Sequence, residues 1–514
     1  MTVVAATPRS PFSAILPDNY EPTGPFRWLA DLVLLDRLNN TGLMIVGLLA
    51  TAASAVGFLW VLREAWNGRV TMRAVVVLAV VAHAVVLMLP LLFSRDVYSY
   101  GYYGRMVSTY GANPYTLSPS DFPLNSLWRL TWPGWRGTSS VYGPLFTWLS
   151  AALTSVAQSV PGLINGFQLL AAAASLGTLA IVGRLVRRVR PDRAVFAVAV
   201  LGLNPIVVFH VVGGGHNDML VALFVAAAVA ALYARRTLLS AVMLGLGMSV
   251  KASAIVPLIL LIVAVAAEAP KHRRLRVLLT YGGITSAIWL ALALPFLTTQ
   301  NPTLGLMEAS GHDSWMAPGQ AVVRLFSGIG GLIAGDPLRV PAQTLARLLL
   351  LATSVACVTL IARRIWRDPA AREPGALVAA WGWGLLVVIL PSPVLFTWYL
   401  MWILPLAWAL PRVPRRALVI LSATLVVSQL VTETALLPSA VAKVNLPYGH
   451  PVAIVVAIWV AADFLRRARA GRSWDAETPG ARFGDRFETG RTRGALPEHP
   501  EPEPRPVLDP TPVG

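Results

Sequence analysis

The feature that most constrains this chain is a series of uninterrupted apolar stretches, each about twenty residues long. They lack the strict alternation of membrane barrel strands and the one-sided stripe of soluble amphipathic helices. A helix of that length satisfies its own backbone hydrogen bonds and spans the hydrocarbon core of a bilayer. About thirteen such stretches can be counted, beginning near residues 42, 73, 162, 194, 218, 237, 252, 276, 342, 375, 395, 416 and 450. The chain is therefore predicted to be an all-α polytopic membrane protein.

The positive charge of the chain indicates its orientation in the membrane. A net charge of +17 would suggest nucleic-acid binding in a soluble protein. Here the arginines form short clusters between apolar stretches, as cytoplasmic loops do. With every cluster in the cytoplasm, the predicted helices alternate consistently, provided that residues 144–158 lie along the outer surface, and the N-terminus lies outside. We predict contact with membrane lipids and no nucleic-acid partner.

Three regions follow from this pattern. Residues 1–41 form an N-terminal segment, residues 42–466 form the membrane domain, and residues 467–514 form a charged and then proline-rich tail. The tail has too little apolar surface to order itself, so we expect a disordered cytoplasmic tail. Two external loops, about 94–161 and 298–341, are much longer than the other connections. Long loops of this kind are usually functional.

Polar and aromatic side chains are predicted to gather on the outer side, at the ends of different helices. Ionisable residues at such positions are costly and tend to mark function. Carboxylates and histidines can bind sugar hydroxyls, cations can neutralise phosphate, and aromatic faces can pack on sugar rings. The group thus favours a polyhydroxylated, anionic substrate, and it consists of Asp96, His216, Asp218, Lys251, His312, Asp313, Trp398 and Tyr399.

Simpler explanations exist for several members of this group. Lys251 can extend its ammonium from a helix end to the membrane surface, and Trp398 can belong to an interfacial aromatic belt. The segment "GGGHND", residues 213–218, fits such explanations less well. Each of its glycines weakens a helix by about 1 kcal/mol relative to alanine, which indicates a close approach of the backbone to another group.

Several motifs, taken in order along residues 73–465, resemble the GT-C superfamily of multi-pass glycosyltransferases. The resemblance is narrower to the polyprenol-phosphomannose-dependent α-(1→6)-mannosyltransferases of mycobacterial and corynebacterial lipomannan assembly. The motifs are "SRDVYSYGYYGRMVSTYGANPY", "SSVYGPLFTWL", "GGGHNDML", "MSVKAS" and "PSPVLFTWYLMW". The resemblance implies a GT-C fold with outer juxtamembrane helices in the first long loop.

The resemblance also implies roles for single residues. Asp96 corresponds to the acid of the first outer loop, which is the expected catalytic base of the family. A second acid beside it is lacking, so no cofactor is predicted firmly and a divalent cation stays possible. Tyr142 stands near Pro144, where the superfamily can have a basic residue, and it is assigned to substrate binding. Phosphate neutralisation then falls to Lys251, Arg95 or Arg105.

The implied reaction moves mannose from polyprenyl-phosphate mannose to a lipid-linked mannan acceptor, with inversion and formation of an α-(1→6) linkage. It would take place at the external face of the plasma membrane, with His216, Asp218, His312 and Asp313 on sugar hydroxyls. Two alternatives are a GT-C enzyme for another polyprenyl-phosphate sugar, such as arabinose or glucose, and a transporter or flippase of a lipid-linked sugar. Transporters tend to place charges at the bilayer midplane within inverted repeats, and neither feature is evident in the sequence.

Overall fold

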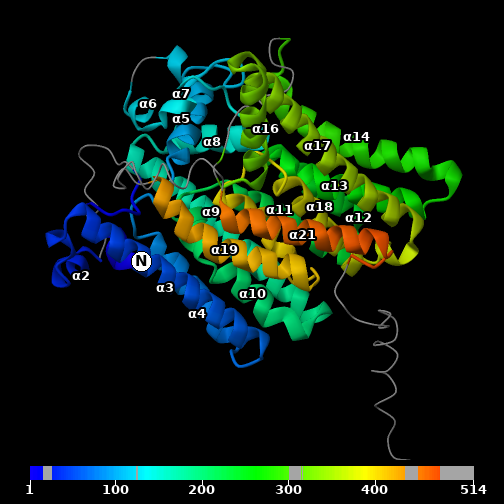
Figure 1. The fold of residues 1–514 in the computed structure, drawn as a ribbon, viewed down its shortest axis with the longest axis horizontal. Helices are drawn as coiled ribbons and strands as arrows, with labels where there is room; N and C mark the ends of the chain where they lie inside the picture. The colour runs from blue at the N-terminus through cyan, green and yellow to red at the C-terminus, as the bar shows by residue number, and fades with distance from the viewer. Residues whose placement is uncertain are drawn as a thin grey trace, which may run out of the picture. The chain divides into compact units, whose positions relative to one another are not determined.

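The computed structural model of the protein describes residues 1–7, 9–14, 26–122, 125–299, 314, 316–433 and 450–474. Residues 1–476 form one compact unit. Its described residues fold into helices joined by turns and loops, and their one β-type pairing is an isolated bridge between Ser13 and Leu92. The all-α prediction is confirmed (Figure 1).

Five helical segments among the described residues are long and apolar enough to cross a membrane. They fit a multi-pass membrane protein, as the apolar stretches predict. These segments are α3 (Asn40–Trp66), α9 (Val160–Val189), Pro191–Val212, which contains α10 (Ala194–Gly202) and the π-helix η4 (Ile206–Val212), Lys271–Phe296, which contains α14 (Arg274–Ala293), and α17 (Asp336–Arg367).

Most of the other predicted stretches form shorter apolar helices. They are α4 (Met72–Val86), α11 (Asp218–Tyr233), α12 (Thr237–Val250), α13 (Ile255–Glu268) and α18 (Pro374–Ile389). The stretches that begin near residues 416 and 450 form longer helices, α19 (Arg412–Glu433) and α21 (Pro451–Arg469). The stretch that begins near residue 395 differs, because it forms two short 3-10 helices, η9 (Thr397–Trp402) and η10 (Leu404–Leu406). Pro405 lies within η10 and has no backbone N–H for a continuous α-helix.

The first long loop contains four short helices, α5 (Asp96–Ser108), α6 (Ser126–Leu130), α7 (Pro133–Arg136) and α8 (Pro144–Val156). Figure 1 shows them together at one end of the unit. Helices α5 and α8 cross closely at Gly104, where a Cβ atom would collide with the carbonyl oxygen of Ser150. Glycine is therefore required at this crossing, and the crossing fixes α5, on which Asp96 lies.

The second long loop is partly helical. Helix α16 (Pro318–Ala334) packs against α17, and Gly335 joins the two with a φ of +70°. Residues 318–334 were predicted to belong to the external loop 298–341, so α16 was not expected. Predicted site residues His312 and Asp313 lie outside the described residues.

At the C-terminal end, α21 continues to Arg469, beyond the predicted domain boundary at residue 466. Trp474 is buried, and its ring lies parallel to that of Phe464 with 5.0 Å between centroids. The predicted tail thus begins with residues that belong to the compact unit. Residues 475–514 lie outside the described residues.

Candidate active site

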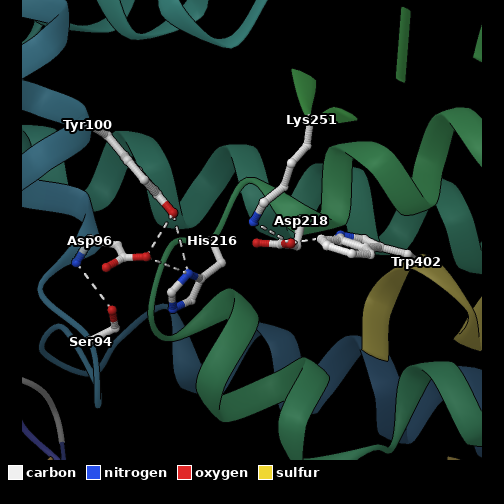
Figure 2. Close-up of polar contacts among 7 residues, drawn as sticks. All are labelled: Ser94, Asp96, Tyr100, His216, Asp218, Lys251 and Trp402. Carbon is white, nitrogen blue, oxygen red and sulfur yellow. Dashed lines mark hydrogen bonds and ion pairs between the residues drawn. The ribbon is translucent and has the colours of Figure 1, made fainter. Parts of the chain in front are cut away.

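Asp96 is the first residue of α5, and its carboxylate faces two other polar side chains (Figure 2). Its Oδ2 lies 3.6 Å from Nδ1 of His216 and accepts a 3.4 Å hydrogen bond from the Tyr100 hydroxyl. That hydroxyl is also 3.4 Å from His216 Nδ1. The Asp96 side chain is 21% exposed, whereas the His216 side chain is fully buried. A substrate hydroxyl can therefore approach the carboxylate while its protein neighbours stay in place.

A second polar cluster surrounds Asp218, at the start of α11. Its Oδ1 accepts a 2.9 Å hydrogen bond from Lys251 Nζ and a 2.7 Å bond from the indole N–H of Trp402. Figure 2 shows this cluster beside the Asp96 group, with Lys251 pointing toward Asp218. The two clusters bring together residues from α5, the 213–218 loop, the end of α12 and η9.

Aromatic rings enclose both clusters. The His216 imidazole stacks on Trp398 with 3.9 Å between centroids. The Lys251 ammonium lies 4.5 Å from the Tyr399 ring centroid and 5.3 Å from that of Trp402. Such cation–π contacts hold the ammonium where water is scarce. Tyr142 is buried and packs edge-on against Tyr100, at 4.9 Å.

The glycine segment explains how His216 reaches Asp96. The π-helix η4 ends at Val212, and the chain then turns through Gly213, Gly214 and Gly215. Gly215 has a φ of +64°, and a Cβ atom there would lie 2.7 Å from Val97 Cγ2. A Cβ at Gly214 would lie 2.9 Å from the His216 ring itself. The predicted close approach is thus to α5 and to the neighbouring imidazole.

The loop before Asp96 is held by backbone hydrogen bonds from two directions. The N–H of Leu92 donates to Gly213 O at 3.0 Å, and the N–H of Phe93 donates to Phe12 O at 2.7 Å. Phe93 has a φ of +61°, an uncommon conformation for a bulky residue. Its ring stacks on His210 of η4 at 4.0 Å. The N-terminal segment and η4 therefore fix the direction in which the chain enters α5.

Burial raises the pKa of the Asp96 carboxyl to about 6, against the opposing effect of the Lys251 charge. Burial, and then the same lysine, lower the pKa of His216 well below its usual value. Near neutral pH, Asp96 is therefore ionised and His216 is uncharged. A carboxylate with a pKa near 6 is a better proton acceptor than an ordinary aspartate.

Several buried polar atoms of the site have no hydrogen-bond partner within the described chain. They are Nε2 of His216, both side-chain polar atoms of Asn217 and Oδ2 of Asp218. Buried polar groups are normally paired, so these atoms require a partner such as an ordered water or a polar group of a ligand. No group of three or more His, Cys, Asp or Glu side chains suited to a metal ion occurs among the described residues.

The other predicted site residues lie apart from these clusters. The guanidinium of Arg95 is 5.1 Å from the ring centroid of Trp132, in the α6–α7 segment. Arg105 donates a 2.8 Å hydrogen bond to the carbonyl of Gln158 on the exposed side of α5. Arg105 is nine residues after Asp96 in α5. This spacing is about two and a half helical turns, so the two side chains point in quite different directions.

Three contributors were not selected from the sequence as site residues: Tyr100, Asn217 and Trp402. Tyr100 is four residues after Asp96, and residues at i and i+4 meet on one face of a helix, so its contact was open to prediction. Asn217 stands between two selected residues. Trp402 lies in the same motif as Trp398 and Tyr399, but its bond to Asp218 joins positions 184 residues apart, which no local pattern reveals.

Comparisons with known proteins relate these residues to one family. Residues 14–267, which include Asp96, His216, Asp218 and Lys251, match the family model described as alpha-(1->6)-mannopyranosyltransferase, N-terminal domain. The chain is 27% identical over 334 residues to alpha-(1->6)-mannopyranosyltransferase A of Mycobacterium tuberculosis, which covers 63% of this chain and 62% of the relative.

Two proteins of Corynebacterium glutamicum are also similar. Alpha-(1->6)-mannopyranosyltransferase A is 30% identical over 34% of this chain and 36% of its own length, and the B protein is 27% identical over 62% and 56%. The matched part thus spans less than two thirds of the length of each of these relatives. No solved structure matches the chain. The family model and these relatives show that the chain is similar to the alpha-(1→6)-mannopyranosyltransferases.

Proposed function

We propose that the protein is an inverting glycosyltransferase that moves mannose from polyprenyl-phosphate mannose to a mannan acceptor, forming an α-(1→6) linkage. The names of its relatives support mannosyl transfer. The observation that carries the chemistry is the Asp96 carboxylate, which is accessible on one side and fixed on the other by Tyr100 and His216. The proposal includes a GT-C fold with its active site at the external face of the plasma membrane.

Asp96 acts as the general base. In the proposed displacement the acceptor 6-hydroxyl oxygen bonds to the anomeric carbon, and the bond from that carbon to the phosphate oxygen breaks. The hydroxyl proton passes to Asp96, and the polyprenyl phosphate leaves with the electron pair. Since the pKa of Asp96 is about 6, the carboxylate is ionised at neutral pH, and its basicity contributes as well as its position.

Lys251 stabilises the leaving phosphate. Its ammonium has three N–H donors, of which one binds Asp218 at 2.9 Å. The other two can turn toward a phosphate oxygen while the Tyr399 and Trp402 rings keep the head group in place. A cation that is already positioned stabilises developing charge without reorganisation. The hydrogen bond to Asp218 positions the Lys251 ammonium, and the Asp218 carboxylate offsets part of its positive charge.

Sugar hydroxyls bind the buried polar atoms that lack protein partners. Asp218 Oδ2 accepts, Asn217 both donates and accepts, and His216 Nε2 completes the group. The His216 ring stacks on Trp398. The arrangement suits a ligand with many hydroxyls, because such a ligand supplies the missing partners.

The test uses membranes that contain the protein, supplied with an α-(1→6)-linked mannobioside and, in separate reactions, with polyprenyl-phosphate mannose, arabinose or glucose. We expect transfer from the mannose donor and an α-(1→6) linkage in the product, assigned by nuclear magnetic resonance. Transfer from only arabinose or glucose would identify a GT-C enzyme for another sugar. Movement of lipid-linked sugar across sealed vesicles without any transfer would instead identify a flippase.

A further inference from the structure

A platform packs against α5, the helix that begins with the proposed base. It consists of residues 126–138, which contain α6 and α7. Arg136 holds it together, because its guanidinium donates to Thr131 O at 3.1 Å and to Arg129 O at 2.8 Å and lies 4.2 Å from the Trp128 ring centroid. The platform is attached to α5 by a 2.8 Å hydrogen bond from the Tyr103 hydroxyl to Thr138 O.

Trp132 lies at the junction of α6 and α7, at the N-cap of α7, and is 48% exposed. The guanidinium of Arg95 is 5.1 Å from its ring centroid. Arg95 is the N-cap residue of α5 and directly precedes Asp96 in the chain. One side chain thus connects the exposed indole with the residue next to the proposed base.

This environment differs from that of a tryptophan that only anchors a protein in the membrane interface. A guanidinium lies over the ring, and the indole belongs to a platform that Arg136 hydrogen bonds hold together. An exposed aromatic face with neighbouring N–H donors is well suited to a pyranose, whose C–H face packs on the ring while its hydroxyls accept hydrogen bonds.

We propose that Trp132 and Arg95 form an acceptor subsite, which binds a mannose unit of the acceptor chain that lies beyond the first two units from the glycosylated end. This inference rests on the proposed transferase function. The terminal sugar of the acceptor must present its 6-hydroxyl to Asp96, so the remaining units extend away from the base. The platform packs against α5 and is a part of the surface along which they can pass.

The test compares a short and a long acceptor with the same protein in membranes. One acceptor is an octyl α-(1→6)-mannobioside, and the other is the matching mannooctaoside, both with polyprenyl-phosphate mannose as donor. For Trp132→Ala we expect KM for the octaoside to rise about threefold to tenfold, the loss of one aromatic packing contact. We expect kcat/KM for the mannobioside to change less than twofold. Trp132→Tyr should recover most of the affinity, since it keeps a flat ring.

Trp28→Ala is the matched control, because Trp28 lies on α2 (Arg27–Leu32) and is 62% exposed. It should leave both acceptors unaffected. If Trp132→Ala and Trp132→Tyr each affected the short and the long acceptor equally, Trp132 would have a structural role and the subsite would be overturned. Wild-type kinetics of Trp132→Ala would also overturn it. If the wild-type protein transfers mannose to neither acceptor, the transferase function itself fails. The two failures are therefore distinguishable.

Discussion

The carboxylate of Asp96 has different surroundings on its two sides. On one side Tyr100 and His216 hold it, and on the other it is accessible. An ordinary surface aspartate has full hydration and a pKa near 4. At Asp96, burial raises the pKa and gives a stronger base, while the nearby Lys251 charge lowers the pKa and limits this gain in basicity.

Asp96→Asn removes basicity with little change in volume. We expect kcat to fall by about a hundredfold or more, the usual contribution of a general base, while the amount of protein in the membrane stays constant. Transfer rates and immunoblots of the same membranes measure the two quantities. Asp121→Asn is the control, because Asp121 bonds only within its own turn at Ser118. A variant with more than a tenth of wild-type turnover would remove Asp96 from this role.

The pH dependence of transfer reports on the same carboxylate. Because burial raises the pKa of Asp96 to about 6, we expect kcat/KM to fall as the pH drops through about 6. The Lys251 charge opposes this rise, so Lys251→Gln should move the midpoint to higher pH, and Lys251→Arg should keep it near the wild-type value. Rate profiles of the three proteins give the midpoints. An unchanged midpoint in Lys251→Gln would indicate a lysine that only extends to the membrane surface.

The sequence predicted the identities of several site residues better than their contacts. Asp96, His216, Asp218 and Lys251 were selected because each follows or ends an apolar stretch on the same predicted side. Their pairing depends on how α5, α11 and α12 pack. The ion pair of Lys251 with Asp218 joins helices α11 and α12, which pack side by side, and only tertiary structure shows that this lysine already has a partner.

At the scale of elements, the connection from η4 to α11 is the part that positions the site. π-Helices are rare in proteins, but those that occur are often found at functional sites. Here the π-helix ends in three glycines that turn the chain toward α5. The glycines were identified in the sequence because they destabilise a helix. The π-helix was not identified, because it has no simple hydrophobic period and its residues were predicted as part of an ordinary apolar stretch.

Gly215→Ala tests this connection. Gly215 has a φ of +64°, and a Cβ atom there would lie 2.7 Å from Val97 Cγ2. We expect the free energy of unfolding to fall by about 1–2 kcal/mol from the backbone conformation alone. We also expect a lower kcat, because His216 shifts. Gly57→Ala is the control, since Gly57 lies in α3 with no atom near a new Cβ, where alanine favours the helix. Thermal unfolding in detergent and transfer assays measure both effects. Equal stability of the two variants would refute the tight turn.

At the scale of the whole molecule, apolar runs predicted the helical class and the positions of most helices. They did not predict α16 or the 3-10 helices η9 and η10, because proline and glycine set the local geometry there and packing decides whether a helix follows. The side of the membrane on which Asp96 lies is a prediction from the arginine clusters.

Introduced cysteines test that orientation. In a Cys357→Ser background, Ser126→Cys in α6 should react with an impermeant thiol reagent added to intact cells. Asp192→Cys, beside Arg190 and Arg193, should react only after the membrane is opened. Both residues are exposed, so their labelling differs only if they are on opposite sides. The reverse pattern would place Asp96 in the cytoplasm and contradict the proposed orientation.

The contact between Phe12 and Phe93 has a consequence for biosynthesis. Phe12 is buried against Phe93, and its carbonyl accepts the hydrogen bond that holds the loop before Asp96. The ribosome releases residue 12 long before residue 93, and α3 and α4 lie between the two. Phe12 therefore cannot contact Phe93 until the hairpin of α3 and α4 has entered the bilayer. The contact that holds the backbone before Asp96 thus forms only after α3 and α4 have been made, although Phe12 is made before them.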